Sequence, residues 1–415
     1  TGTPGHRSSP CQIPGTTWAE PESGILSSYA TKTDGTLWGW GNNERGALGQ
    51  NSRNPARYSS PVQIPGSWDK LSHTKEYNLI GIKSDGTLWM QGINNLGQLG
   101  QNNNTWIKSP VQIPGSWSDA DGGYRKTLAV KNDGTLWAWG YGYQGGLAHG
   151  GSPGNTNRSS PVQVTGGGTT WTSPKTGGAS GGSSAALKTD GTLWTWGRDY
   201  AGAGGWNTEG QNFSSPVQVA GFPPSTGFVK LYDSGAVGCS ILSTCYVDED
   251  GTLYTWGRNE YGQLGQGNRT NRSQPIQVGG KGIWSQNIAF NDDEMRMCVR
   301  RDGTLWSWGQ NSTGQLGLNS RTQYSSPKQV GTGAYWSTEI GTLARGPSTS
   351  AAVKTDGTLW TWGMGQVGQL GQNQAGQTKY SSPTQVGSRS NWKYVHITGG
   401  TLIATNTDGE LWTCG

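Results

Sequence analysis

One eight-residue phrase recurs eight times along this 415-residue chain, with copies 48 to 60 residues apart. It reads Asp-Gly-(Thr/Glu)-Leu-(Trp/Tyr)-x-(Trp/Gln/Cys)-Gly, and its copies begin at Asp34, Asp85, Asp133, Asp190, Asp250, Asp302, Asp356 and Asp408. A period of this length is typical of propellers and solenoids, in which each unit buries its apolar surface against its neighbours. The repeat therefore constrains the fold, and the function must come from residues that depart from it.

Two further markers keep the same period. A Pro followed by a short apolar run occurs eight times, at Pro10, Pro61, Pro110, Pro161, Pro216, Pro275, Pro327 and Pro383. A Gly-x-Leu-Gly turn precedes it and is clear at 46–49, 97–100, 262–265, 314–317 and 368–371. The turn is degraded near Gly145 and Gly202, and the sequence contains no eighth copy.

Each unit reads as four short strands. A Trp usually opens the first strand, and a small apolar run then turns through Asp-Gly, a strong hairpin signal for which we expect a type I′ turn. Alternation places Trp38 and Trp40 on one face of the third strand and Leu37 on the other, so both faces should be buried between neighbouring sheets. A Pro at the start of the fourth strand suits an outer edge.

No Gly- and Pro-free window of ten residues has helical apolar spacing, so helix should be nearly absent. The sequence predicts an all-β fold, a single β-propeller over residues 1–415 with eight four-stranded blades; seven blades is the alternative. The N-terminal strand should complete the C-terminal blade and so close the ring. The expected blades are 18–64, 68–113, 117–164, 171–219, 228–278, 284–330, 336–386, and 392–415 with 1–13.

The cysteines depart from the repeat in an informative way. Cys414 stands where most units have Trp, and Cys11 stands where most fourth strands have Val, both in the unit assembled from the chain ends. We therefore predict a Cys11–Cys414 disulfide, with two unrelated buried thiols as the alternative, and a second disulfide between Cys239 and Cys245 as a possibility. Cys298 is expected to be a buried free thiol. A disulfide between the chain ends implies an oxidising environment.

The amino-acid composition indicates a location outside the cell or on a virion surface. Charged residues make up 14% of the chain, Gly accounts for 70 residues, and the net charge is only +5. The charge is thinly spread, so we expect no nucleic acid partner. No apolar run approaches the length of a membrane span, and no signal peptide is visible, so no membrane insertion is expected.

These repeats resemble the regulator of chromosome condensation repeat family, whose blades carry the same Asp-Gly-x-Leu-Trp-x-Trp-Gly strand, Gly-Gln-Leu-Gly turn and later Pro-x-x-Val strand. The resemblance covers essentially the whole chain and implies a propeller that holds a partner on its flat faces. The family includes a nuclear guanine-nucleotide exchange factor, a plant ultraviolet photoreceptor and a secreted bacterial β-lactamase inhibitor. The units here are more similar to those of phage and environmental bacterial members.

Signals for catalysis are poor. Only four His are present, at His6, His73, His149 and His396, and they are scattered among different units. The segment 178–182 formally matches a nucleophile elbow, but it lies in a Gly/Ser loop with no helix after it. We therefore expect no enzyme activity, no catalytic residues, no metal and no cofactor.

The loops between third and fourth strands carry aromatic residues that the repeat does not require. We predict that these rim residues bind a partner: Trp106, Tyr141, Tyr143, Tyr200, Trp206 and Tyr261. The sequence thus favours a non-catalytic interaction propeller, either a virion component (phage tail, fibre or decoration protein) or a secreted or cell-surface binding protein. Its partner would be a protein or surface glycan, possibly other virion proteins, and its location extracellular or on a virion surface. The alternatives are an inhibitor or regulator of a partner enzyme and, less favoured because no basic tail or wedge loop is seen, an exchange factor.

Overall fold

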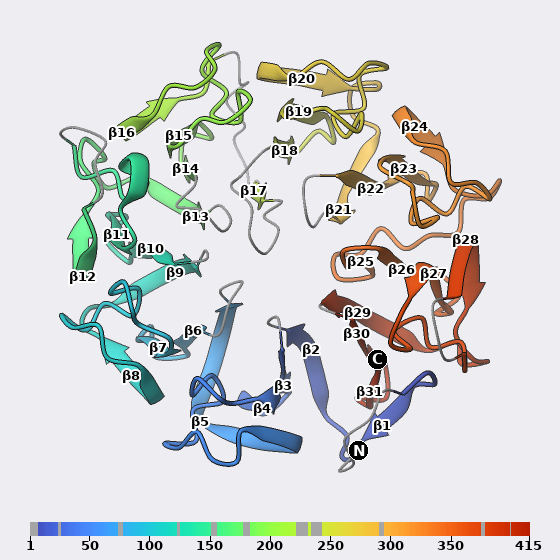
Figure 1. Ribbon diagram of the computed structural model, residues 1–415, viewed down its shortest axis with the longest axis horizontal. Coiled ribbons are helices and arrows are strands. Elements are labelled where there is room, and N and C mark those ends of the chain that lie inside the picture. The colour runs from blue at the N-terminus through green and yellow to red at the C-terminus, as the bar shows by residue number, and fades with distance from the viewer. Residues whose placement is uncertain are drawn as a thin grey trace.

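Small antiparallel sheets surround a central axis in a ring, with the strands of each sheet ordered from the axis to the periphery (Figure 1). The computed structural model describes residues 7–23, 26–73, 78–122, 125–150, 156–176, 183–220, 231–233, 243–289, 294–374, 378–398 and 400–415. Within these residues, the only helical element is the 3₁₀ turn η1 (Tyr143–Gly145). The all-β prediction is confirmed.

Seven blades follow one another along the chain, each with its innermost strand first. Blades 1 and 2 contain β2 (Trp18–Ser23), β3 (Ser27–Lys32), β4 (Thr36–Asn42), β5 (Arg57–His73), β6 (Leu79–Lys83), β7 (Leu88–Gly92) and β8 (Ile107–Ile113). Blades 3 and 4 contain β9 (Trp117–Gly122), β10 (Lys126–Lys131), β11 (Leu136–Gly140), β12 (Arg158–Gln163), β13 (Trp171–Thr176), β14 (Ser184–Lys188), β15 (Leu193–Gly197) and β16 (Phe213–Gln218). Blades 5 and 6 contain β17 (Leu231–Asp233), β18 (Ser243–Val247), β19 (Leu253–Gly257), β20 (Arg272–Val278), β21 (Trp284–Ala289), β22 (Met295–Arg300), β23 (Leu305–Gly309) and β24 (Tyr324–Gln329). Blade 7 contains β25 (Leu343–Arg345), β26 (Thr349–Val353), β27 (Leu359–Gly365) and β28 (Thr378–Gln385).

The strand β5 belongs to two blades. Its residues up to Ser67 pair with β4, and its residues from Trp68 pair with β6. This continuity joins blades 1 and 2 into one seven-stranded sheet, whereas each other sheet in the described part of the chain has four strands. Division of β5 at this point leaves eight four-stranded blades.

Blade 8 combines the two ends of the chain. It contains β29 (Trp392–Thr398), β30 (Thr401–Asn406), β31 (Leu411–Cys414) and β1 (Cys11–Ile13), in the order β29-β30-β31-β1 from the axis outward. The strands β1 and β31 are antiparallel, and Cys11 lies opposite Thr413. The first described residue, Arg7, exchanges backbone hydrogen bonds with Gly415, at 2.9 and 2.7 Å.

This register makes the predicted Cys11–Cys414 disulfide wrong, and both residues are free thiols. Residues opposite each other share a face of the sheet, and the next residue points to the other face. Cys11 therefore shares a face with Thr413, whereas the Cys414 side chain faces blade 7, where its Sγ lies 3.3 Å from a Cβ placed on Gly371. Cys245 and Cys298 are buried, and Cys239 lies outside the described residues. Cys298 is a free thiol, as expected.

The Asp-Gly hairpins differ from the predicted type I′ turn. In blade 1 the backbone N–H of Gly35 donates to the Lys32 carbonyl at 2.9 Å, and only the Gly has a positive φ, of 78°. The arrangement is therefore a type I turn followed by a bulge Gly. Asp34 keeps a negative φ because its carboxylate accepts hydrogen bonds from the backbone and hydroxyl of Thr36, at 2.9 and 2.7 Å.

A cation covers the Trp of the third strand in six blades. It is the Lys or Arg two residues before Asp-Gly, and its charged end lies 3.7 to 4.7 Å from the ring centre. These cations are Lys32, Lys83, Lys131, Lys188, Arg300 and Lys354. The contact explains why the first Trp of Leu-Trp-x-Trp can remain only half-buried.

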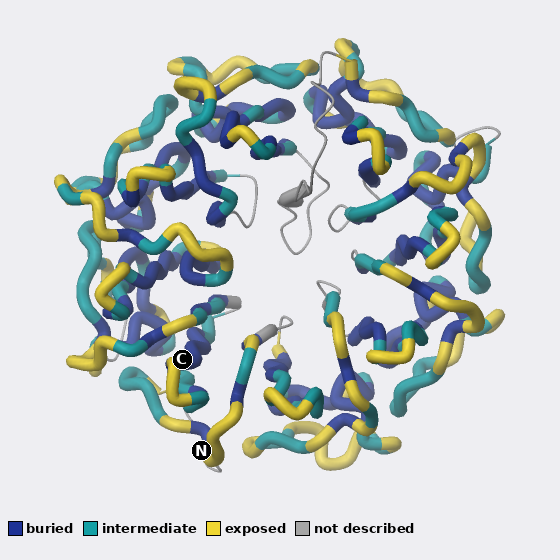
Figure 2. The backbone as a smooth tube through the Cα atoms, turned by 180° about the vertical axis from the view of Figure 1, so that it is seen from behind, coloured by how far each residue is buried: buried dark blue, intermediate teal, exposed yellow. Residues whose placement is uncertain are grey.

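The core lies between adjacent blades, midway between axis and periphery (Figure 2). Tyr29, Leu37 and Leu48 of blade 1, for example, pack with Trp68 and Leu79 of blade 2. The expected burial of both sheet faces is confirmed for Leu37 and Trp40, which are 0% and 8% exposed. Blade 7 departs from the pattern, because Trp336 forms only an isolated bridge to Lys354 and β25 begins later. Among the described residues, no helix is long and apolar enough to cross a membrane.

A backbone hydrogen bond also crosses seven blade boundaries near the periphery. A residue just after the Gly-x-Leu-Gly turn, or its degraded equivalent, donates to a carbonyl in the fourth strand of the next blade, or just before that strand in blade 8, at 2.6 to 2.8 Å. The donor–acceptor pairs are Asn51–Lys108, Asn102–Ser159, Gly150–Ser214, Asn207–Ser273, Gly267–Ser325, Asn319–Ser381 and Asn373–Ser8.

Candidate binding site on the innermost strands

The rim aromatics predicted from the sequence lie in the loops between third and fourth strands of blades 2 to 5. Tyr141 and Tyr143 stack on each other, with ring centres 5.7 Å apart. Trp206 packs edge-on against Phe213 at 4.5 Å. These three residues are thus held by neighbouring rings within the protein.

The other three rim aromatics lie beside arginines. Trp106 has Arg45 and Arg53 at 5.8 and 5.5 Å, and its Nε1 donates to Asn95 at 2.6 Å. Tyr200 lies 5.5 Å from Arg198, and Tyr261 lies 5.8 Å from Arg258. Tyr200 is the most exposed of the set, at 44%. Binding by the rim residues stays a prediction.

A cavity of about 280 Å³ lies on the innermost strands of blades 1 to 4, apart from these loops. Its lining includes four consecutive residues of β5, from Asp69 to Ser72. Its charged lining residues are Glu20, Asp69, Lys70, Asp119 and Lys175. Three carboxylates and two ammonium groups therefore share one small space.

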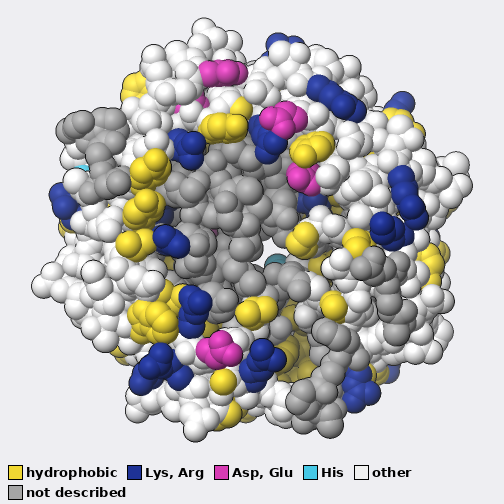
Figure 3. Space-filling model, viewed as in Figure 1, with side chains coloured by type: hydrophobic (Ala, Val, Ile, Leu, Met, Phe, Trp, Pro, Cys, Tyr) yellow, Lys and Arg dark blue, Asp and Glu magenta, His cyan; other side chains and the backbone are white. Residues whose placement is uncertain are grey.

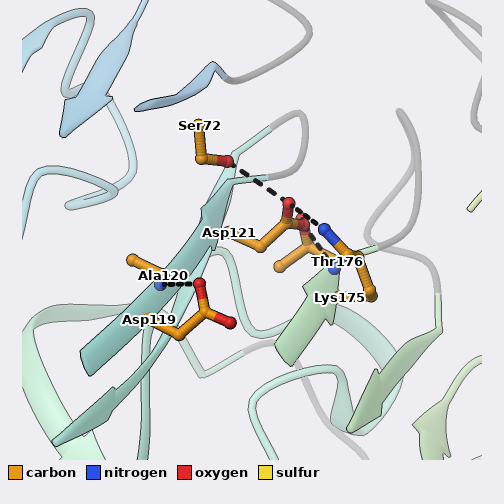
Figure 4. Close-up of polar contacts among 6 residues, drawn as sticks. All are labelled: Ser72, Asp119, Ala120, Asp121, Lys175 and Thr176. Atoms are coloured by element: carbon orange, nitrogen blue, oxygen red, sulfur yellow. Dashed lines mark hydrogen bonds and ion pairs between the residues drawn. The ribbon is translucent and has the colours of Figure 1, made fainter. Parts of the chain in front are cut away.

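Asp121 joins three blades beside this cavity (Figure 4). Its Oδ2 accepts hydrogen bonds from the backbone N–H and hydroxyl of Thr176, both at 2.8 Å. Its Oδ1 accepts from Lys175 Nζ at 3.2 Å and from Ser72 Oγ at 3.3 Å. Since these partners saturate the carboxylate, Asp121 has a positioning role, and it also holds Lys175 in place.

Asp119 lies two residues away on the same face of β9 and is less well satisfied. Its Oδ1 accepts one hydrogen bond, from the backbone N–H of Ala120 at 3.0 Å, and Oδ2 has no partner among the described residues. Burial raises the pKa of Asp119 above its ordinary value of 3.8, although Lys175 and Lys70 act to lower the pKa and Asp121 acts to raise it. Lys70 in turn donates to the carbonyl of Ser118 at 2.8 Å. A half-buried carboxylate with a free oxygen in a cavity is a candidate ligand-binding group.

The cavity lining contains neither His nor Cys, and its polar side chains are carboxylates, ammonium groups and hydroxyls. No cluster of three or more His, Cys, Asp or Glu that could hold a metal occurs in the part of the chain that the structure describes. Of the four His, His6 and the side chain of His73 lie outside the described residues, as does the segment 178–182. His149 is half-buried, and burial lowers its pKa.

The distribution of surface charge bears on whether this protein binds nucleic acid. On the face seen in Figure 3, Lys and Arg side chains are spread around the ring and do not gather into one patch. A nucleic-acid surface would concentrate them along one stripe. The expectation that this protein binds no nucleic acid remains a prediction that this distribution favours.

Sequence reasoning missed the innermost-strand cavity. A signal was present, because three successive units carry a charged residue two positions after the opening Trp, at Glu20, Lys70 and Asp119. Lys175 comes from the fourth unit, four positions after its opening Trp, and only the fold shows that it lies close to Asp119.

Comparison with protein families identifies the repeats. The regulator of chromosome condensation (RCC1) repeat matches residues 34–73, 250–288, 302–338 and 356–403, and a second RCC1 repeat description matches residues 236–263. The resemblance inferred from the Asp-Gly phrase is thus confirmed.

Three curated proteins are similar to parts of this chain. The chain is 29% identical over 236 residues to the ultraviolet-B receptor UVR8 of Arabidopsis thaliana, a match of 56% of this chain and 51% of the receptor. It is 27% identical over 368 residues to the mitochondrial RCC1 domain-containing protein RUG3 of the same plant, covering 81% of this chain and 79% of RUG3. The human E3 ubiquitin-protein ligase HERC2 is 28% identical over 55% of this chain, but only 5% of HERC2 is covered. The chain therefore spans about half the length of the receptor and a small part of the ligase.

Solved structures support the fold. Prp20p from Saccharomyces cerevisiae, described with its binding to Gsp1p and histones, has a TM-score of 0.63 at 16% identity, covering 93% of this chain and 92% of Prp20p. Human WBSCR16 has a TM-score of 0.61 at 17% identity, covering 91% and 98% of the two chains. At these identities the similarity establishes the propeller fold alone.

Proposed function

We propose that this chain, five segments of which match the regulator of chromosome condensation repeat, is a non-catalytic propeller that binds a partner protein. The observation that carries the proposal is Asp119, a half-buried carboxylate with a free oxygen in a cavity formed by four blades. Asp119 lies on the innermost strand β9, and a site built on a strand is more precise than a site on a loop. Prp20p is a propeller of the same fold that is described as binding other proteins.

The charges define the kind of group that the site accepts. Lys175 is already paired with Asp121, and Lys70 donates to a backbone carbonyl. Glu20, Asp69 and Asp119 then leave the cavity with an excess of carboxylate. A partner side chain that carries a positive charge, such as Arg, would pair with Asp119 Oδ2 and offset the cost of burying that carboxylate.

A selection experiment tests this proposal. Peptides displayed on a library are selected on the full chain, with counter-selection on the Asp119→Ala variant. We expect enriched sequences to share a basic residue and to bind Asp119→Ala at least about tenfold more weakly, the equivalent of about 1.4 kcal/mol. A matched control is Asp408→Ala, in a hairpin outside the cavity. Enriched peptides that bind all three proteins equally would refute the site.

A role as inhibitor or regulator of a partner enzyme is compatible with the same site. Such a protein would elute as a one-to-one complex with a soluble enzyme, whereas a structural component of a particle would copurify in fixed symmetric copy number. Analytical ultracentrifugation of the complex separates the two.

The location on a virion or outside the cell is a proposal with reduced support. It rested in part on a disulfide between the chain ends, and those cysteines are free thiols. Low charge and abundant Gly are the remaining arguments. Copurification with particles, or recovery from culture medium, would test this location directly.

A further inference from the structure

A buried Asn holds the loop between third and fourth strands in four blades. It is the second residue after the Gly that ends the Asp-Gly phrase, and it is 0% exposed in each of these blades. Its side-chain oxygen accepts a hydrogen bond from the backbone N–H five residues later, at 2.8 to 3.2 Å. Its amide donates to the backbone carbonyl nine residues later, at 2.8 to 3.0 Å. These residues are Asn43, Asn94, Asn259 and Asn311.

Blade 4 has Asp199 at this position, in a loop that otherwise keeps the same register. The backbone N–H of Gly204, five residues later, donates to Asp199 Oδ1 at 2.9 Å. The residue eight positions later, Asn207, donates to the Ser273 carbonyl of the next blade at 2.8 Å, as the residue eight positions after the Asn does in blades 1, 2, 5 and 6. Thr208, nine positions after Asp199, is therefore the equivalent of the carbonyl acceptor.

The two side chains differ in one group. Asp199 Oδ2 takes the place of the amide nitrogen, and an ionised carboxylate has no proton to donate. Asp199 is only 3% exposed, and its Oδ2 has no hydrogen-bond partner among the described residues. The hydroxyl of Thr208 is likewise buried without a partner in this part of the chain. Buried acceptors without a donor are costly, whereas a proton on Oδ2 would restore the bond that the Asn amide makes in the other blades.

The surroundings of Asp199 favour its protonated form. Burial raises the pKa of Asp199 to about 6, although the backbone N–H of Gly204 acts to lower the pKa. The carboxylate of Glu209 acts to raise this pKa, and the backbone N–H of Gly210 acts to lower it. The neutral carboxyl group is thus favoured by the loss of water around it and by a like charge in the same loop.

The cations near this loop do not neutralise Asp199. The strands β15, β16, β18 and β19 carry no carboxylate, imidazole or cation. Arg198 lies 5.5 Å from the Tyr200 ring, Arg272 opens β20, and His149 belongs to the blade 3 loop that contacts β16. None of these three forms an ion pair with Asp199 in the part of the chain that the structure describes.

We propose that Asp199 is a pH-sensitive switch for the blade 4 loop, residues 198–212. When the carboxyl group is protonated, Oδ2 donates to the Thr208 carbonyl, as the Asn amides do in other blades, and the loop closes on its blade. Ionisation removes this bond and leaves two acceptors next to each other, so the loop opens more often. The loop carries Tyr200 and Trp206, two of the predicted rim residues, so the switch controls how firmly this part of the rim is held.

A carbon-13 titration tests the protonation state directly. The full chain is labelled at the side-chain carboxyl carbon of Asp, and the Asp199 signal is identified by its absence from the Asp199→Asn variant. Its chemical shift should titrate with a midpoint at about pH 6. A midpoint near pH 4, where an unperturbed Asp titrates, would overturn the switch.

Hydrogen–deuterium exchange measured by mass spectrometry tests the response of the loop. A raised folded pKa gives a closure that is complete below the ordinary pKa of 3.8 and is lost as the pH rises through the folded value. After correction for the intrinsic effect of pH, residues 198–212 should exchange about tenfold more slowly at pH 5 than at pH 7.5, as linkage gives for these two pKa values. In Asp199→Asn the corrected rates at the two pH values should be equal.

Blade 5 provides the matched control. Its equivalent loop, residues 258–272, carries Asn259 and should show no such difference in the unmodified protein. Asn259→Asp should transfer the pH response to this loop. A pH effect of equal size in all peptides, or one that Asp199→Asn retains, would contradict a local switch.

Calcium chloride added at pH 7.5 separates a proton from a metal ion at Asp199. Exchange of residues 198–212 that is unchanged by calcium supports the proposal. Slower exchange in calcium that Asp199→Asn abolishes would overturn the proton as the group that closes the loop.

Discussion

Asp121 Oδ2 accepts hydrogen bonds from both the backbone N–H and the hydroxyl of Thr176, each at 2.8 Å, and so connects the innermost strands of blades 3 and 4. Lys175 and Ser72 bind the other oxygen of the same carboxylate. One side chain thereby positions residues from three blades around the cavity that we propose as the protein-binding site.

Thr176→Val tests the energy of this connection. The change keeps the shape of the side chain but removes one bond to a charged acceptor, so the free energy of unfolding should fall by about 1.5–3 kcal/mol in urea denaturation. Thr33→Val is the control, because Thr33 is exposed and its hydroxyl has no side-chain hydrogen bond among the described residues. If both variants lose equal stability, the Asp121–Thr176 contact does not stabilise the blade boundary.

Gly314→Ala tests the packing of the turn on the next blade. Gly314 has a φ of 83°, and a Cβ placed on it would lie 2.8 Å from Ser381 Cα of blade 7. Gly331 has a φ of 70° but nothing within 4 Å of a Cβ, so Gly331→Ala has only the backbone cost of about 1–2 kcal/mol. Gly314→Ala should therefore lower the urea midpoint clearly more than Gly331→Ala, and equal midpoints would contradict tight packing of the turn.

Asp119→Asn should stabilise the protein at neutral pH. Burial raises the folded-state pKa of Asp119 above 3.8, so ionisation costs more in the folded than in the unfolded chain. That cost is absent at low pH and appears as the pH rises through the unfolded and then the folded pKa. The free energy of unfolding measured in urea should be higher for Asp119→Asn than for the unmodified protein at pH 7, and equal for the two at about pH 3. A variant that is less stable than the unmodified protein at pH 7 would argue against a binding role.

The Asp-Gly turns should make the free energy of unfolding decrease at acidic pH. Hydrogen bonds from the Thr two residues later lower the pKa of the turn Asp in six blades, at Asp34, Asp85, Asp133, Asp190, Asp302 and Asp356. A lowered folded pKa contributes stability that is complete above the ordinary value of 3.8 and is lost as the pH falls through the folded pKa.

Urea midpoints measured from pH 6 to pH 2 should therefore fall below about pH 4. The fall should be smaller in Asp302→Asn than in the unmodified protein. Asp250→Asn is the control, because the backbone N–H of Thr252 donates to Asp248 in that blade. Identical acid profiles for the two variants would show that the turn carboxylates do not produce the effect.

The two thiols of blade 8, Cys11 and Cys414, should differ in their reactivity toward iodoacetamide. Cys414 is buried, which raises its pKa to about 12, whereas Cys11 is partly exposed. Iodoacetamide added to the folded protein should label Cys11 and leave Cys414 unmodified until urea unfolds the chain, since the thiolate is the reactive form. Peptide mapping by mass spectrometry gives the answer, and a linked Cys11–Cys414 peptide in a non-reduced digest would contradict the register of β1 and β31.

The sequence by itself determined the repeat and therefore the propeller. Asp-Gly followed two residues later by Leu and then Trp or Tyr defines a hairpin in every unit, because the Gly provides the positive φ and alternation gives each sheet two apolar faces. Such faces can be buried only against neighbouring sheets, so the stacking of blades followed from local pattern alone. Even the cation beside the third-strand Trp could have been read from its constant position two residues before Asp-Gly.

Tertiary structure alone decided the sites and the cysteine geometry. A shift of one residue between β1 and β31 places Cys11 and Cys414 on opposite faces, and register depends on packing that residue identity does not reveal. Asp119 meets Lys70 and Lys175 only because their strands converge toward the axis of the ring.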